Sequence, residues 1–147
     1  MNNHLPIALH IVGFLTSANG EPLTSERMAA IYGTSPVVLR RVLSQLRRAG
    51  LIETQRGKSG GSQLARAPGD ITLREVYEAV RGEQPVLPMY SQNCTGLVAP
   101  VLGEYLGKLF HEAEEALLEK LDAVTVAEMD QVVRQRIMTH ASSKGIC

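Results

Sequence analysis

The chain has 147 residues, 44% of them hydrophobic, and its Lys and Arg balance its Asp and Glu to a formal net charge of zero. A chain of this length and hydrophobic content can form one sizeable core with an appended helix. The absence of a signal pattern or an apolar run of about 18 residues favours a cytoplasmic protein without membrane segments. Two cysteines, Cys94 and Cys147, exclude a disulfide framework and a Cys-only metal site within one chain.

The charges are unevenly spread along the chain. Residues 1–66 carry eight Lys and Arg against three Asp and Glu, whereas residues 67–147 carry seven against twelve. A basic half joined to an acidic half indicates one lobe that faces nucleic acid and one that faces protein, although chance clustering of surface charge would give the same count.

Two helices are expected in the first 33 residues. The first covers residues 5–17, with a broad apolar surface and Pro6 in its first turn, where a missing N–H costs little. Thr24 or Ser25 caps the second, over residues 26–32, and Gly33 supplies the positive φ that ends it.

A third helix and a β-hairpin follow. Ser35 caps the helix, Pro36 occupies its first position, and Gly50 stops it. Its apolar residues recur at helical spacing and are Leu39, Val42, Leu43 and Leu46. Residues 51–55 and 62–65 are short strand candidates that flank a projecting glycine-rich loop. This order of parts predicts a helix-turn-helix followed by a wing, in a mainly α protein with a small β-wing.

The second half of the chain is predicted to pair two copies. Thr72 and Glu75 form a capping box that starts a helix ending near residue 82. A long helix follows a hinge, and its apolar stripe needs a cover, for which a second copy is the expected source. The stripe consists of Leu102, Tyr105, Leu106, Leu109, Phe110, Leu117 and Leu121. We therefore predict a winged helix-turn-helix DNA-binding domain at 1–82, a hinge or sensor loop at 83–96, a dimerisation helix and C-terminal helix at 97–138, and a flexible tail at 139–147.

The helix from residue 35 is the predicted DNA-reading element, because an α-helix fits the major groove and its first turns reach deepest. Arginine forks onto guanine, valine meets a thymine methyl, and an arginine on a thin glycine-rich loop can enter a narrow minor groove. The predicted DNA-contacting residues are Thr24, Ser35, Val37, Val38, Arg40, Arg41, Arg48, Arg56, Lys58, Ser59 and Gly60. A nucleotide-binding loop is disfavoured, because RGKSGGS lacks the GxxxxGK[ST] spacing and joins two strands.

The segments IALHIVGFL, SPVVLRRVLSQLRRAGLIETQRGKSGG, LARAPGDITLREVYEAVRG and LFHEAEEALLEKLDAVTVAEM resemble the Rrf2 family of bacterial winged-helix regulators over nearly the whole chain. The resemblance implies a homodimer on a palindromic promoter site, with Arg56 as the wing arginine and Val37, Val38 and Arg40 in base-reading positions. The wing departs from the family pattern, since Lys58 and Ser62 stand where Pro and Tyr are usual.

The resemblance also bears on cofactors. Members that bind a [2Fe–2S] cluster hold it with three cysteines in the loop before the long helix, where this chain has only Cys94. The spacing of His4, His10 and His111 does not require them to complete such a site, so we expect no cofactor and no metal.

Cys94 is nevertheless a candidate sensor. Near the N-terminus of the long helix its thiolate would be favoured, and oxidation there would shift the two DNA-binding domains relative to each other. An unreactive thiol and a small effector in a hinge pocket are the alternatives. The expected function is a DNA-binding transcriptional regulator, most simply a repressor. A protein-interaction module of the same fold is the competing class, and no catalytic constellation indicates an enzyme.

Overall fold

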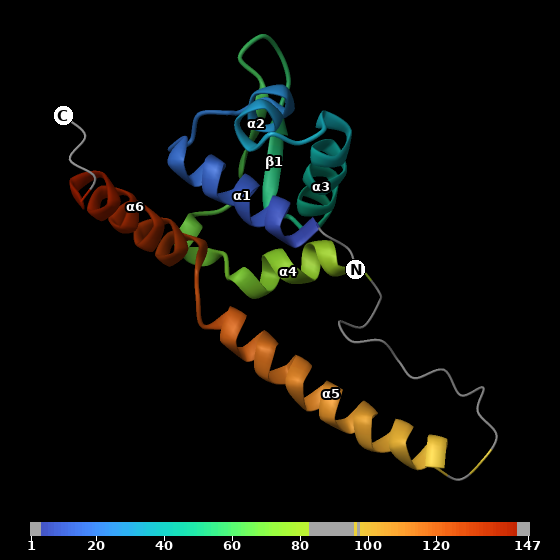
Figure 1. Cartoon of the computed structure of the whole chain (residues 1–147). Coiled ribbons are helices and arrows are strands. Elements are labelled where there is room, and N and C mark those ends of the chain that lie inside the picture. Colours follow the sequence, from blue (N-terminus) through green and yellow to red (C-terminus); the bar gives the residue numbers. More distant parts are fainter. Residues whose placement is uncertain (1–3, 83–95, 97, 144–147) are drawn as a thin grey trace.

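The computed structural model describes residues 4–82, 96 and 98–143 (Figure 1). Helices in this part are α1 (His4–Ser17), α2 (Ser25–Tyr32), α3 (Pro36–Arg48), α4 (Leu73–Arg81), α5 (Val98–Asp122) and α6 (Val126–Ser143). The strands β1 (Ile52–Gln55) and β2 (Gly61–Leu64) form an antiparallel hairpin, and a short 3₁₀ turn, η1 (Pro68–Asp70), precedes α4. The predicted class, mainly α with a small β-wing, is confirmed.

The hydrophobic core lies between α1, α2, α3 and α4. The apolar stripe predicted on α3 faces inward, and Leu39, Val42 and Leu46 are fully buried. They pack with fully buried residues of α1, α2 and α4, namely Ile11, Val12, Met28, Val76 and Val80. Because the apolar side of α3 is buried in this way, its polar side is left on the surface.

The predicted helix ends around the turn are confirmed. The Thr24 hydroxyl accepts a hydrogen bond of 3.2 Å from the Arg27 N–H, and the Ser35 hydroxyl accepts one of 3.3 Å from the Val37 N–H. Gly33 has a φ of 74°, the left-handed conformation that ends α2. These caps fix the angle at which α3 leaves the turn, and so fix the direction of its exposed face.

The wing is tied to the start of α2. In the hairpin, Ile52 lies opposite Leu64 and Gln55 lies opposite Gly61. Outside the hairpin, Leu23 and Ser62 exchange backbone hydrogen bonds of 2.9 and 2.8 Å, which add a short third pairing to the edge of β2. The wing and the helix-turn-helix are therefore held together by backbone bonds as well as by the core.

Gly61 is required by this pairing. A Cβ at this position would lie 2.6 Å from the Leu23 carbonyl carbon and oxygen. We expect Gly61→Ala to lower the free energy of unfolding by about 1–3 kcal/mol, because backbone atoms must move to relieve the contact. Urea denaturation tests this, with Gly69→Ala as the control, since a Cβ on Gly69 meets no atom within 4 Å. Equal stability of the two variants would contradict the expectation.

The C-terminal helix returns to the first domain. Val126 is fully buried in the core, its N–H donates to the Ile71 carbonyl at 2.9 Å, and the first turns of α6 lie beside α1 (Figure 1). The sequence pattern predicts that this helix belongs to the dimerisation unit and ends at residue 138. The structure differs because the bridge between Thr72 and Thr125 draws the start of α6 onto η1 and α4. Without a glycine or proline to stop it, the helix continues to Ser143.

The long helix α5 projects from this body (Figure 1). Its C-terminal half lies beside α4, where a partly buried ion pair joins Arg81 to Glu114. Around the helix its apolar residues fall into two groups. Leu106, Phe110 and Leu121 are half-buried, whereas Leu102, Tyr105, Leu109 and Leu117 are exposed, as are Val98 and Val101. Among the described helices, none is both long and apolar enough to cross a membrane.

Candidate nucleic-acid interface

The exposed side of α3 is strongly basic. Arg40, Arg41, Arg47 and Arg48 all lie on the surface, and Arg56 and Lys58 are exposed in the wing loop. Within the part of the chain that the structure describes, Arg40 is the one member of this set that pairs with a carboxylate. The other five cations are available to an anionic partner, and they lie on the two elements that a winged helix presents to DNA.

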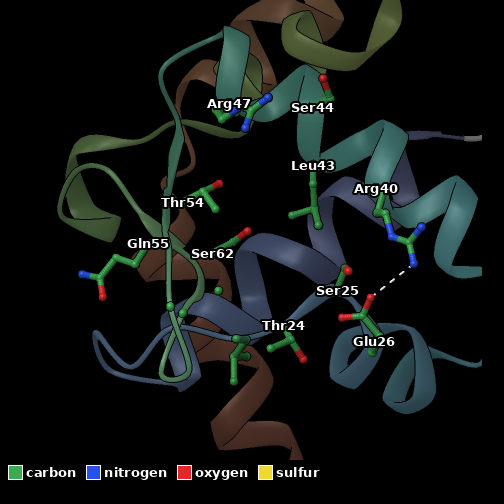
Figure 2. A pocket seen from close by; sticks show the side chains of 14 residues that line it. Thr24, Ser25, Glu26, Arg40, Leu43, Ser44, Arg47, Thr54, Gln55 and Ser62 are labelled. Carbon is green, nitrogen blue, oxygen red and sulfur yellow. Dashed lines mark hydrogen bonds and ion pairs between the residues drawn. The ribbon is translucent and has the colours of Figure 1, made fainter.

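A groove of about 430 Å³ separates α3 from the wing (Figure 2). Thr24, Ser25 and Glu26 line its α2 end, and residues of β1, β2 and the wing loop line the opposite wall. The wall on α3 consists of Arg40, Leu43, Ser44 and Arg47. A basic helix, hydroxyl groups and a glycine-rich hairpin thus surround one concave surface, a composition suited to a phosphate backbone rather than to an apolar ligand.

Arg40 is oriented by Glu26. Its Nη2 lies 3.2 Å from Oε1 of Glu26, which extends from the first turn of α2 (Figure 2). The pKa of Glu26 lies below its usual range, first because its carboxylate accepts a hydrogen bond from its own backbone N–H, then because it accepts one from Ser25. Arg40 lowers this pKa further through its hydrogen bond and its positive charge. The carboxylate is therefore ionised at neutral pH and faces the same groove as the arginines.

The structure distinguishes the two valines of the predicted base-reading turn. Val37 is 71% exposed, whereas Val38 is half-buried and packs against the core. Of the two, Val37 is the one whose methyl groups are free to contact a DNA base. The placement of Val38 follows from its distance of four residues from Val42, which is fully buried.

The arginines of α3 divide between two sides of the helix. Arg40 and Arg47, seven residues apart, line the groove, whereas Arg41 and Arg48 lie outside it. The predicted contact set included Arg48 and left out Arg47, and it did not contain Glu26, Thr54 or Gln55 of the groove wall. The seven-residue spacing from Arg40 would have indicated Arg47. The other three come from segments with no local DNA-binding signature.

The wing loop presents its polar residues outward. Arg56, Lys58 and Ser59 are exposed at the far end of the hairpin, and a hydrogen bond of 3.0 Å from the Gly60 N–H to the Gly57 carbonyl closes the turn. A Cβ on Gly60 would lie 2.4 Å from the Gln55 carbonyl oxygen, so the tight turn itself requires this glycine. Two of the predicted contact residues, Gly60 and Thr24, line the groove. The cations of the wing loop, Arg56 and Lys58, lie outside it.

The described residues do not fit an iron site. They contain no group of three or more His, Cys, Asp or Glu residues able to hold a metal ion. His4 contacts Gln45, the His10 ring lies tilted against that of Tyr32, and His111 lies beside Glu115 on α5, so the three histidines are dispersed. Cys94 and residues 83–95 of the predicted hinge lie outside the described residues, as does Cys147.

A recognition helix with an exposed basic face beside a wing defines a winged helix-turn-helix DNA-binding protein. The sequence model of the Rrf2 family, described as an iron-dependent transcriptional regulator, matches residues 1–131. The chain belongs to the Rrf2 family. It is a sequence-specific DNA-binding transcriptional regulator, in agreement with its relatives.

Individual relatives support this assignment. The HTH-type transcriptional regulator NsrR of Geobacillus kaustophilus is 30% identical over 131 residues, which cover 88% of each chain. Among solved structures, T. potens IscR superposes with a TM-score of 0.69 at 22% identity, covering 90% of this chain and 87% of that one. CymR, the global cysteine regulator of B. subtilis, gives a TM-score of 0.65 at 24% identity, covering 90% and 96%. These two structures show the shared fold.

Proposed function

We propose that the protein acts as a homodimeric repressor at a palindromic promoter site. The observation that carries this proposal is the uncovered apolar side of α5. Leu102, Tyr105 and Leu109 are 40%, 65% and 45% exposed on a helix that projects from the body. A second copy that covers this side would remove a large apolar area from water and place two copies of α3 on one DNA molecule.

The symmetry of such a dimer determines the form of its operator. Two recognition helices related by a two-fold axis read two half-sites of inverted sequence, about 34 Å or one helical turn of DNA apart, or a multiple of this. Among the described residues there is no additional domain to recruit polymerase. Occupation of the promoter by the dimer is then the simplest regulatory action, which is repression.

A protein-interaction module that has lost its operator is the competing function. The exposed cations on α3 and in the wing argue against this alternative. Unpaired like charges that lie close together repel each other, and a protein that does not bind DNA gains nothing from that arrangement. The proposal also places the protein in the cytoplasm, where promoter DNA is accessible.

Binding to the DNA upstream of its own gene tests the repressor proposal. We expect the purified protein to shift this fragment at concentrations at which a scrambled fragment stays free, in 0.15 M salt. A reporter under the same promoter should lose activity when the protein is present in an in vitro transcription reaction. Selective binding combined with increased transcription would show an activator, and equal binding of both fragments would exclude the proposed operator.

The inducing signal remains a prediction that centres on Cys94. If thiol oxidation releases the protein, diamide or peroxide should free the fragment, dithiothreitol should restore the complex, and Cys94→Ser should stay bound throughout. Binding of the wild-type protein that is indifferent to oxidant would favour a small effector instead. We further propose that no iron–sulfur cluster is needed, so protein purified without oxygen should bind DNA while showing no visible cluster absorbance.

A further inference from the structure

The groove contains an acidic residue, Glu26, whose negative charge by itself would weaken DNA binding. Glu26 is exposed at the N-terminal end of α2, in the region where a helix-turn-helix approaches the phosphate backbone. Its ionised carboxylate would repel phosphates, and it is the acidic residue among those that line the groove. A carboxylate beside an anion-binding site cannot raise the affinity of that site for an anion through its charge alone, because like charges repel.

The carboxylate makes one contact that explains its position. Its Oε1 accepts a hydrogen bond from Nη2 of Arg40 at 3.2 Å, across the turn from α2 to α3 and fourteen residues along the chain. Glu26 lies in the first turn of α2, and the start of this helix is fixed by the Thr24 cap. Arg40 is thus attached to a fixed point while one edge of its guanidinium remains free.

An arginine held in this way differs from a free surface arginine. A free guanidinium moves among many rotamers and attracts any phosphate, whatever the sequence. A guanidinium with one N–H group already bonded to a carboxylate has less net charge to offer to phosphate and a restricted direction. Its remaining donors keep the fork geometry that matches O6 and N7 of guanine.

We infer that Glu26 is a positioning residue for DNA recognition: it holds Arg40 in the orientation that reads a base and reduces the attraction of Arg40 for phosphate. This inference rests on the proposed function, because it requires α3 to enter the major groove of an operator. It assigns to Glu26 an effect on selectivity rather than on overall affinity. Arg47, which lines the same groove without a carboxylate partner among the described residues, is the contrasting arginine.

The test compares Glu26→Gln with the wild-type protein on two DNA fragments, the promoter and a scrambled sequence, over a series of salt concentrations. The ratio of the two dissociation constants should fall roughly fivefold in Glu26→Gln, which is the upper end of what an exposed ion pair contributes. The loss should come mainly from tighter binding to scrambled DNA. The slope of log K against log salt for that DNA should steepen by up to about 0.9 for each chain, since Arg40 becomes free to contact a phosphate.

Glu78→Gln is the matched control. Glu78 pairs with Arg74 at 3.0 Å on the exposed side of α4, so this variant loses the same charge from a similar ion pair outside the groove. Circular dichroism and thermal unfolding of both variants establish that they are folded. We expect the selectivity of Glu78→Gln to equal that of the wild-type protein.

A double-variant cycle separates positioning from simple repulsion. If Glu26 acts through Arg40, then Glu26→Gln should leave the selectivity of an Arg40→Ala protein unchanged. The inference is overturned if the selectivity ratio of Glu26→Gln equals that of the wild type, or if Glu26→Gln changes the ratio equally in the Arg40→Ala background. Wild-type protein that shows no preference for the promoter fragment would instead refute the proposed function on which the inference depends.

Discussion

Glu in place of Arg56 is expected to weaken binding to the promoter fragment by about 100-fold or more, because each copy loses a cationic contact and gains a repelling carboxylate. Arg56 is exposed where the wing loop begins and pairs with no carboxylate among the described residues. Its replacement therefore leaves no internal charge unpaired, and the fold should keep its thermal stability. Electrophoretic mobility shift or fluorescence anisotropy at 0.15 M salt measures the loss.

Arg136→Glu serves as the matched control for this result. Arg136 is exposed on α6, beyond the first turns of this helix that contact α1, and its reversal changes the net charge by the same amount. We expect this variant to bind within about twofold of the wild type, because exposed charges separated by more than a Debye length are screened. If both variants lose affinity equally, the effect is one of net charge and the assignment of the wing is wrong.

Leu109→Glu on α5 is expected to convert the protein to a monomer. Leu109 lies in the middle of the exposed apolar side of the helix, and a carboxylate buried there against a second copy would have no partner. Sedimentation or light scattering should then give the mass of one 16.0 kDa chain. Affinity for the full promoter site should fall by about 100-fold, since the two half-sites are no longer bound together.

His111→Glu introduces the same charge two residues along the chain. His111 is exposed on the opposite side of α5, beside Glu115, so it lies outside the proposed interface. This variant should remain dimeric and should bind the promoter as the wild type does. A dimer that persists in Leu109→Glu would show that another surface joins the two copies, and the exposed residues of α6 would be the next to test.

Local sequence signals predicted the parts of the fold that depend on near neighbours. Capping residues act on helix ends within four residues of themselves, so the sequence alone predicts where the helices begin and end. The examples are Gly33, Ser35 with Pro36, and Thr72 with Glu75. The buried side of α3 was equally readable, because helical spacing places Leu39 and Leu46 on one side.

Features that join distant segments were not predictable in this way. The backbone pairing of Leu23 with Ser62 and the burial of Val126 beside Ile71 depend on the folded arrangement, and no periodicity in either segment signals them. The same limit applies to the candidate site. The position of Arg40 on the helix predicts it as a DNA-contacting residue, but its ion pair with Glu26 joins two elements across the turn, and a single sequence contains no record of that contact.

The attachment of α5 has a mechanical consequence. The helix is joined to the DNA-binding domain at its C-terminal half, through α4 and the pair of Arg81 with Glu114, and its 25 residues span about 37 Å at about 1.5 Å per residue. The part of α5 that precedes Glu114 extends about 24 Å from this attachment at about 1.5 Å per residue, so a tilt of about 5° there displaces its far end by about 2 Å. In the proposed dimer, a small change in how α5 packs on α4 would therefore shift each recognition helix relative to the groove that it reads.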